Sequence, residues 1–459
     1  MAEIQPFRAY RYDTNRVAPS DVLTQPYDKI SPAMQERYYE VSPYNLITIE
    51  KGRALPGDSP ENNVYTRAAE AIDEWIADRI LRRDSTPAIY VYSQDFEVPG
   101  TRARRERIGF IALTRVEDYD AHVVFRHERT LSAPKADRIE LLRQTRAQTG
   151  QLFLLYDDPA RQIDAWLDDA AARAKPALEL RDEYGVTHRL WPLADSAFVS
   201  RVQKAMAPKK LVIADGHHRY ETALHYRDEC RGGESKTDPM AASEFAMATF
   251  INTHSRGLLI LPTHRTVANL ANFDFGRFRK ALAPYFDWYS YPFLDGPSRE
   301  AAYAEFRKDL EGRSHGRRAI GVYAGAGTDG SANKPGPAFY LFALQKGLDL
   351  EEVLPDVPEA QRELDVVLLH RLILQKGLGI TPEDVASEKN VGYEREMHAA
   401  IGAVDASRAQ IALLLNPVPV KQVVDIALGG DVMPQKSTDF YPKLLSGIAI
   451  YRLEGRISG

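Results

Sequence analysis

The chain has 459 residues, of which 44% are hydrophobic and 27% are charged. These proportions are ordinary for globular domains, so they exclude a largely disordered, collagen-like or coiled-coil protein, and the length allows roughly two to four domains. Lys and Arg total 59 against 64 Asp and Glu, and the net charge of −5 argues against a protein whose partner is nucleic acid.

The single cysteine, Cys230, excludes an internal disulfide and a zinc site with several Cys ligands, and it suits a reducing compartment. We expect its thiol to be buried and inert. The first residues lack the apolar stretch of a signal peptide, and no apolar run is long enough to span a membrane. We therefore expect a cytoplasmic protein without a membrane partner.

Segments typical of strands and of helices alternate along the chain. Helices are expected over residues 63–82, 136–147, 160–174, 218–230, 361–376, 393–402 and 421–429, with further helices flanking residues 285–293. Strands are expected over residues 88–98, 107–119, 209–216, 245–261 and 411–418, and in a hairpin of residues 318–325 and 338–344. The mixture predicts an α+β protein.

We expect three parts. Residues 1–105 form an N-terminal α/β segment, residues 106–265 a catalytic core, and residues 266–459 a C-terminal α/β domain. The sequence shows no internal repeat and no long linker rich in Pro or Ser, so the boundaries rest on the order of the expected elements.

The most unusual segment is LVIADGHHRYETALHY, residues 211–226. An apolar strand runs into Asp215 and Gly216, and a helix follows with His217, His218 and Arg219 in its first turn. The free N–H groups at a helix N-terminus attract anions, and glycine lets a ligand approach the backbone closely. Arginine offers a planar donor fork for phosphate, so the segment predicts a phosphate-binding turn.

Asp215 has two further interpretations. It could hold a divalent cation or orient a histidine, or it could simply cap the helix while the histidines lie on the surface. Four polar groups on one strand–glycine–helix turn favour a ligand site over the cap.

A second candidate is RHERTLSAPKADRIELL, residues 126–142, where His127 and Glu128 follow a strand-like run. A carboxylate at this position could accept the proton of a substrate hydroxyl. The alternative is a surface turn before a helix, and the segment taken alone favours that alternative.

Three further positions carry candidate ligands for a substrate. QPYDKISP places Tyr27 and Asp28 in a turn defined by proline, and LPTHR places Arg265 after an apolar run. Resemblance to a family motif suggests that Tyr27 and Asp28 face a substrate, although turn chemistry alone would account for the proline and aspartate. Arg265 could add its charge to the substrate pocket or simply begin a solvated loop.

PQKSTDFYPK, residues 434–443, contains Lys436, Ser437 and Thr438 in a row. One cation and two hydroxyls suit a phosphoryl oxygen, but no glycine precedes the lysine, so this is not a P-loop. The G-x-G-x-x-G pattern of residues 325–330 leads into prolines and a strand, which favours a hairpin loop over a dinucleotide site.

Together these motifs resemble a known family. QPYDKISP, HERT, ADGHHRY, LPTHR and PQKSTDFYPK match a large prokaryotic family of unknown function over nearly the whole chain. The middle region also resembles the ParB/sulfiredoxin-type fold of the free serine kinases, which share a D-G-H-H-R phosphate-binding motif and an H-E segment with a catalytic Glu.

The resemblance implies a ParB/sulfiredoxin-like nucleotide-binding core with N-terminal and C-terminal elaborations. It implies that residues 215–219 bind the phosphates of ATP or ADP and that Glu128 is the base with His127 beside it. Mg²⁺ is also expected, because phosphates usually bring it, and Asp215 could hold it. Sulfiredoxin chemistry is not expected, because Gly216 and His217 stand where those enzymes carry a cysteine.

The leading hypothesis is a small-molecule kinase that phosphorylates a hydroxyl, such as that of free serine. The alternatives are a nucleotide-binding regulatory or partner-binding protein and a phosphate-ester hydrolase. The sequence leaves open the acceptor, the choice between ATP and ADP, and the oligomeric state, a homo-oligomer included.

Overall fold

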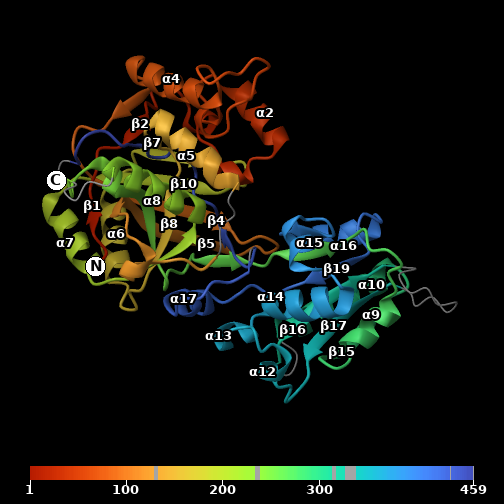
Figure 1. Cartoon of the computed structure of the whole chain (residues 1–459). Helices are drawn as coiled ribbons and strands as arrows, with labels where there is room; N and C mark the ends of the chain where they lie inside the picture. Colours follow the sequence, from red (N-terminus) through yellow and green to blue (C-terminus); the bar gives the residue numbers. More distant parts are fainter. Residues whose placement is uncertain (129–132, 233–237, 313–316, 326–336, 435, 458–459) are drawn as a thin grey trace. The chain divides into compact units, whose positions relative to one another are not determined.

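The computed structural model describes residues 1–457 except 129–132, 233–237, 313–316, 326–336 and 435 (Figure 1). The chain folds into two compact units: unit 1 holds Met1–Leu259 and Phe440–Gly459, and unit 2 holds Ile260–Asp439. The chain therefore leaves unit 1 once and returns to it for its last residues. The three-part division expected from the sequence stays a prediction.

Unit 1 is built on a mixed nine-stranded sheet. Its strands lie in the order β6 (Val124–Phe125), β11 (Leu211–Asp215), β8 (Leu152–Tyr156), β12 (Phe245–Asn252), β5 (Arg104–Arg115), β4 (Ile89–Glu97), β10 (Thr187–Leu193) and β9 (Leu178–Arg181), and β1 (Ile4–Gln5) pairs with β5. β6 and β11 run parallel, as do β8 and β12, whereas β11 and β8 run antiparallel. The expected strands at 88–98 and 107–119 are thus confirmed as an antiparallel pair.

Helices and short strand pairs surround this sheet. The helices are α1 (Pro19–Val22), η1 (Tyr27–Lys29), α2 (Pro32–Val41), α3 (Ile47–Glu50), α4 (Val64–Ala77), η2 (Tyr119–Ala121), α5 (Ala133–Thr145), α6 (Gln162–Arg173), α7 (Ser196–Met206), α8 (His217–Arg231) and η3 (Ala242–Glu244). The short pairs are β2 (Tyr10–Tyr12) with β3 (Leu81–Arg83), and β7 (Ala147–Gln148) with β21 (Tyr451–Arg452).

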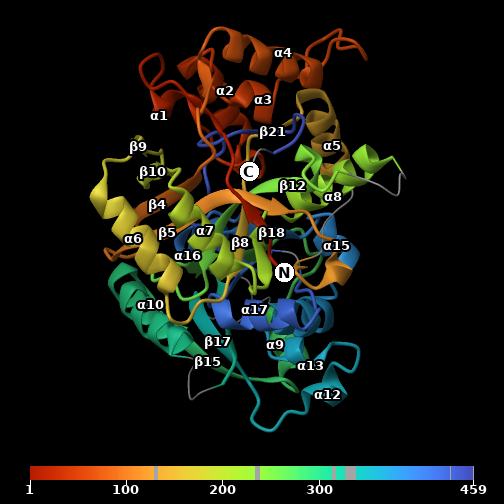
Figure 2. The ribbon, with the colours of Figure 1, turned by 90° about the vertical axis from the view of Figure 1, so that its left-hand side faces the viewer.

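The two faces of the sheet bury different side chains, because successive residues of a strand point to opposite faces. On one face, Val91, Phe110 and Leu154 join a core with side chains of α6, α7 and α8. Figure 2 looks onto this layer, with α6 and α7 in front of the strands. The opposite face carries Gln94 and Arg107, both buried polar side chains.

Local sequence explains why α4 begins where it does. Asn63 accepts hydrogen bonds from the first turn, and Thr66 bonds back to Asn63 in a capping box. Ile72 and Trp75 are buried on its inner face. The helix expected over 63–82 is confirmed, and it ends at Ala77.

Unit 2 is built on a six-stranded antiparallel sheet. Its strands lie in the order β15 (Phe286–Pro292), β17 (Ala338–Leu344), β16 (Ala319–Ala324), β19 (Ile411–Leu414), β14 (His264–Val267) and β18 (Val391–Glu394). The helices are α9 (Phe275–Leu282), α10 (Gly296–Glu311), α12 (Leu350–Val353), α13 (Glu359–Arg362), α14 (Asp365–Leu368), the wide-turned η4 (Leu369–Gly377), α15 (Pro382–Ala386), α16 (Met397–Asp405) and α17 (Val420–Leu428). Strands β13 (Leu259–Leu261) and β20 (Asp439–Tyr441) contain the two boundaries between the units.

Two expectations in unit 2 need comment. β16 and β17 form the expected antiparallel hairpin, and most of the glycine-rich pattern at its tip lies outside the described residues. The helix expected over 393–402 is wrong at its beginning: residues up to Glu394 belong to β18, paired with β14, and α16 starts at Met397. Sheet pairing overrides the local helical pattern here.

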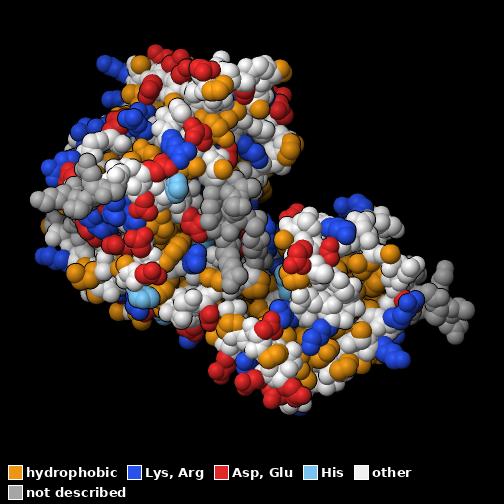
Figure 3. Space-filling view, viewed as in Figure 1, with side chains coloured by type: hydrophobic (Ala, Val, Ile, Leu, Met, Phe, Trp, Pro, Cys, Tyr) orange, Lys and Arg blue, Asp and Glu red, His pale blue; other side chains and the backbone are white. Residues whose placement is uncertain are grey.

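The structure also bears on membrane contact and surface charge. Within the described ranges, the helices are all too short or too polar to cross a bilayer. Acidic and basic side chains are interspersed over the face of unit 1 that Figure 3 shows. A large mixed sheet flanked by helices is the architecture that carries the candidate site.

Candidate functional site

The candidate site begins where β11 ends. Gly216 has φ +92°, a left-handed conformation that glycine adopts without strain, and it serves as the N-cap of α8. No side chain of the described residues caps this helix end. Asp215 is therefore not the helix cap, and the first N–H groups of α8 are left for other partners.

Asp215 lies among cations. Its Oδ2 is 3.6 Å from Nη2 of Arg219 and 3.9 Å from Nζ of Lys443. Burial by itself would raise the pKa of Asp215, but the charges of Lys443, Arg219 and Lys29 outweigh it and lower the pKa below its ordinary value. The carboxylate is ionised at neutral pH.

Two histidines meet at the start of α8. Nδ1 of His127 lies 2.6 Å from the carbonyl oxygen of Ile213, to which it donates, and the backbone N–H of His127 donates to Nε2 of His217 at 3.4 Å. Their ring centroids are 4.7 Å apart. Burial lowers the pKa of His127 to about 4 and the pKa of His217 well below its usual value, so both rings are neutral at pH 7.

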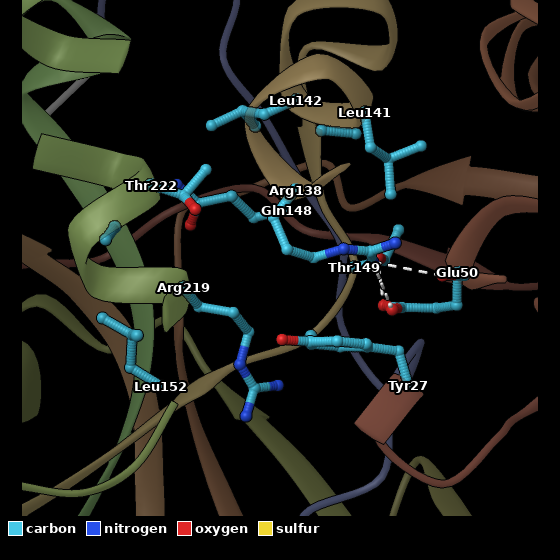
Figure 4. Close-up of a pocket in the computed structure, with 13 residues that line it drawn as sticks. Tyr27, Glu50, Arg138, Leu141, Leu142, Gln148, Thr149, Leu152, Arg219 and Thr222 are labelled. Atoms are coloured by element: carbon cyan, nitrogen blue, oxygen red, sulfur yellow. Dashed lines mark hydrogen bonds and ion pairs between the residues drawn. The ribbon is translucent and has the colours of Figure 1, made fainter. Parts of the chain in front are cut away.

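A pocket opens beside this turn (Figure 4). Its empty volume, counted out to its open mouth and including open solvent there, is about 520 Å³. It is lined by Tyr27, Glu50, Arg138, Leu141, Leu142, Ala147, Gln148, Thr149, Gly150, Leu152, Arg219, Thr222 and Ala246. Five of these are Leu or Ala, so the pocket has an apolar wall as well as charged groups.

Tyr27 stands between two arginines in this pocket (Figure 4). The guanidinium of Arg138 lies over the Tyr27 ring, 4.3 Å from its centroid, which is a cation–π contact. Burial raises the pKa of Tyr27 to about 12, and the nearby Arg219 acts against this shift. The phenol therefore stays protonated and can donate a hydrogen bond.

Glu50 fixes Arg138 from the other side of the pocket. Its Oε2 lies 3.5 Å from Nη1 of Arg138, and its backbone oxygen accepts from the same nitrogen at 3.1 Å. Thr149 donates to Oε1 of Glu50. The side chain of Glu50 is almost completely buried, so the pair is shielded from solvent screening.

The structure brings together part of the predicted set. One turn contains Asp215, Gly216, His217 and Arg219. The ring of His127 contacts His217 of this turn, and Tyr27 lines the adjoining pocket. In the same region, His218 is half-buried on α8, Glu128 is half-buried directly after His127, and Asp28 is exposed in η1.

The remaining predicted residues belong to unit 2. Arg265 is completely buried there and donates to the carbonyl oxygen of Lys436 at 3.0 Å. Ser437 is buried and donates to Pro434, while Lys436 is exposed and Thr438 half-buried. The phosphate contacts predicted for residues 436–438 and the substrate contact predicted for Arg265 stay predictions.

Sequence reasoning missed four residues of this region: Lys29, Glu50, Arg138 and Lys443. Signals for three of them were present, because QPYDKISP contains Lys29, RHERTLSAPKADRIELL contains Arg138, and Lys443 closes PQKSTDFYPK. Nothing in the sequence pattern singled out Glu50, whose role follows from its burial.

The residues do not fit a metal ion held by protein ligands alone. Across the described part of the chain, no three His, Cys, Asp or Glu side chains are grouped as metal ligands. At Asp215, the carboxylate predicted to bind Mg²⁺, two cationic groups already stand within 4 Å. Mg²⁺ at this turn stays a prediction that depends on the phosphates of a ligand.

Comparison with known proteins identifies the family. The family described as "Protein of unknown function (DUF1015)" matches residues 4–388. The chain belongs to the DUF1015 family. The expected membership of a family of unknown function is therefore confirmed, and no curated protein matches this DUF1015 chain.

Solved structures resemble this DUF1015 protein only distantly. A conserved hypothetical protein from Pyrococcus furiosus aligns with TM-score 0.31 and 12% identity over 69% of this chain and 87% of its own. A free serine kinase in complex with AMP aligns with TM-score 0.33 and 12% identity over 69% and 83%. SbnI with C-terminal truncation from Staphylococcus aureus aligns with TM-score 0.32 and 10% identity over 73% and 85%. At these TM-scores the likeness carries neither fold nor function over to this chain.

Proposed function

We propose that this protein binds a nucleotide, ATP or ADP, and transfers a phosphoryl group from it to the hydroxyl of a small metabolite, with free serine as the first candidate. One observation carries the proposal. An uncapped helix N-terminus follows Gly216, and Arg219 of the same helix turn lines the adjoining pocket of about 520 Å³.

The turn supplies what phosphate binding requires. The N–H groups at the start of α8 and the helix dipole favour an anion, and Gly216 has no side chain to block its approach. Arg219 adds a guanidinium whose Nε is buried without a hydrogen-bond partner among the described residues. A phosphate oxygen would satisfy this nitrogen, since a buried donor left unpaired costs about 1–3 kcal/mol.

The pocket supplies contacts for the rest of the nucleotide. Leu141, Leu142 and Leu152 offer apolar contact, and Tyr27 offers a ring and a protonated hydroxyl. Ligand sites usually combine such an apolar lining with a few placed polar groups. The assignment of Asp28 to the acceptor remains part of the proposal.

The base in this proposal is Glu128, with His127 beside it. The acceptor oxygen attacks the terminal phosphorus, the bond from phosphorus to the leaving phosphate oxygen breaks, and the hydroxyl proton passes to the base. His127 is neutral at pH 7, and because Nδ1 donates to Ile213, its Nε2 is the unprotonated nitrogen. His127 is thus the second candidate for the proton.

Turnover with defined substrates tests the function. Purified protein is incubated with ATP or ADP, Mg²⁺ and a panel of hydroxylated metabolites, and phosphorylated products are quantified by mass spectrometry. We expect one phosphorylated acceptor for each nucleotide consumed. Nucleotide binding without any product would favour the regulatory alternative, and release of inorganic phosphate without an acceptor would favour a hydrolase.

The role of Glu128 is tested separately. Glu128→Gln should keep nucleotide affinity and lower turnover by about 10²–10⁴-fold, because an amide cannot accept the proton. Glu97→Gln, at an exposed position of β4, is the matched control and should leave turnover unchanged. Turnover of Glu128→Gln at the wild-type rate would exclude Glu128 as the base and leave His127 as the candidate.

A further inference from the structure

Arg107 of β5 is a charged side chain with no exposure to solvent. Its guanidinium donates to the backbone oxygens of Tyr441 at 3.2 Å and Pro442 at 2.5 Å, and it lies over the ring of Phe153. Burial lowers the pKa of Arg107 to about 10, so the group remains a cation at neutral pH. A buried cation is tolerated only where its donors are satisfied, and here carbonyl groups of the C-terminal segment satisfy them.

Gln94 extends the same set of contacts. Its Oε1 accepts from Nε of Arg107 at 3.1 Å, and its Nε2 donates to the backbone oxygen of Lys443 at 2.8 Å. Three consecutive carbonyl groups, those of residues 441, 442 and 443, are therefore held by two side chains of neighbouring strands. Residues 440–447, which we call the strap, lie fixed against the sheet of unit 1.

The strap continues along the candidate site. Gln151 donates to the backbone oxygen of Leu445 at 2.9 Å, and the N–H of Gly447 donates to the backbone oxygen of Thr149 at 2.8 Å. Thr149 and its neighbour Gly150 line the pocket. The strap thus joins the pocket wall to the turn at Asp215, where Lys443 lies.

Lys443 and Asp215 are close but not directly hydrogen-bonded. Their 3.9 Å separation exceeds the 2.7–2.9 Å or so of a charged N–H···O bond, and the same holds for the 3.6 Å between Arg219 and Asp215. The carboxylate therefore holds both positive charges near the start of α8 through charge attraction. The Lys443 side chain is only 9% exposed, so its charge is weakly screened.

We infer that the strap completes the ligand site, with Lys443 binding a phosphate oxygen of the ligand and with Arg107 and Gln94 as positioning residues for it. The inference rests on the proposed function, because it requires a phosphorylated ligand at the turn. Lysine suits this role as a compact charge that meets phosphate without a fixed geometry.

Binding experiments with three probes test the inference. Lys443→Met removes the charge and keeps the length of the side chain, and calorimetry measures its affinity for ADP, inorganic pyrophosphate and adenosine. We expect affinity for ADP and pyrophosphate to fall about tenfold to a hundredfold, and affinity for adenosine to change less than about twofold. Lys443→Arg should recover most of the loss.

A matched control separates the site from general effects of removing a lysine. Lys209 is also a largely buried lysine near an aspartate, with Nζ 3.5 Å from Oδ1 of Asp158. Lys209→Met should bind all three probes as the wild type does. Equal losses for adenosine and ADP in Lys443→Met would overturn the inference, since they would mean that the strap only supports the fold.

A double-mutant cycle tests the positioning role of Gln94. Gln94→Leu should weaken pyrophosphate binding in the wild-type background and have little further effect in the Lys443→Met background, because it acts through Lys443. Additive losses would overturn this role. Thermal unfolding of each variant confirms that the compared proteins are folded.

The possible outcomes separate the inference from the proposed function. Wild-type protein that binds pyrophosphate but not ADP, with the loss in Lys443→Met, would support Lys443 and contradict the nucleotide function. Wild-type protein that binds ADP, with unchanged affinity in Lys443→Met, would contradict only the inference. Binding of neither anion by the wild type would overturn both.

Discussion

Gly150 leaves the space that the guanidinium of Arg219 occupies: a Cβ atom at residue 150 would lie 2.7 Å from Nη1 of Arg219. It would also lie 3.2 Å from Oγ of Ser446 and 3.4 Å from Oε1 of Glu50. A glycine in the pocket wall is therefore part of how Arg219 is placed, and it lies in the bend between β7 and β8, far from α8 in the sequence.

The first prediction concerns Gly150→Ala. Because the nearest atom is the end of a flexible side chain, the methyl group should displace Arg219 while the free energy of unfolding changes little. Affinity for ADP or pyrophosphate should fall about tenfold, as measured by calorimetry. Gly402→Ala, where a Cβ meets nothing within 4 Å, is the control. Unchanged affinity in Gly150→Ala would mean that the placement of Arg219 does not matter for binding.

The second prediction concerns Arg219 itself. Arg219→Ala should weaken pyrophosphate binding by more than about tenfold, because a charged donor to phosphate is lost. It should also raise the pKa of Asp215, since one of the cations that lower it is removed. Carboxyl titration by NMR measures this shift. The control is Arg173→Ala on α6, at a largely exposed ion pair, and it should change neither the pyrophosphate affinity nor the pKa of Asp215. If Arg219→Ala binds pyrophosphate as tightly as the wild type does, the phosphate-binding turn is contradicted.

The third prediction is a dependence of stability on pH. The pKa of His127 is about 4 in the folded protein, below its usual 6.5, so the unfolded chain binds the proton more readily between these values. The contribution of His127 to the free energy of unfolding is fully present above about pH 6.5. It is lost as the pH falls towards about 4, and the full loss amounts to about 3 kcal/mol. Urea unfolding measures the free energy of unfolding between about pH 6.5 and about pH 4. Over this range it should decrease less for His127→Asn than for the wild type.

His122→Asn provides the comparison for that experiment, because His122 is exposed. Its pH profile should follow the wild-type profile in shape. If the pH profile of His127→Asn also has the wild-type shape, the proton uptake on unfolding arises from other histidines, such as His217.

The fourth prediction concerns Cys230. The sequence suggested a buried, inert thiol, and the predicted burial is wrong: Cys230 is exposed near the end of α8. A thiol reagent such as DTNB should therefore modify one group per chain in native protein, without denaturant. Cys230→Ser should show no reaction, and a native wild-type protein that reacts only after unfolding would contradict the exposed position.

Local patterns predicted the elements whose signals lie within one segment. The spacing of Ile72 and Trp75 predicted α4, and the run from β11 through Gly216 predicted the turn and α8, because apolar periodicity and a glycine are local features. The strand β8 was missed, since a short apolar run does not by itself distinguish a strand from a buried helix segment.

The site was predicted in part for the same reason. Asp215, Gly216 and Arg219 are neighbours in sequence, so one motif contains them all. Glu50, Arg138 and Lys443 reach the same region from three distant segments, and a single sequence gives no distances between them. Their roles follow from burial and charge, which appear only in the folded chain.

The return of residues 440–459 to unit 1 has a consequence for synthesis on the ribosome. Domains usually fold in order as the chain emerges, the N-terminal one first. Here the strap that Arg107 holds is made after all of unit 2, so unit 1 waits for residues 440–447 before the proposed phosphate site is complete. A stalled or truncated chain that ends before Phe440 would carry the turn at Gly216 without Lys443, and would expose the buried guanidinium of Arg107 without its carbonyl partners. Synthesis of the strap after unit 2 thus makes the assembly of this region a late event.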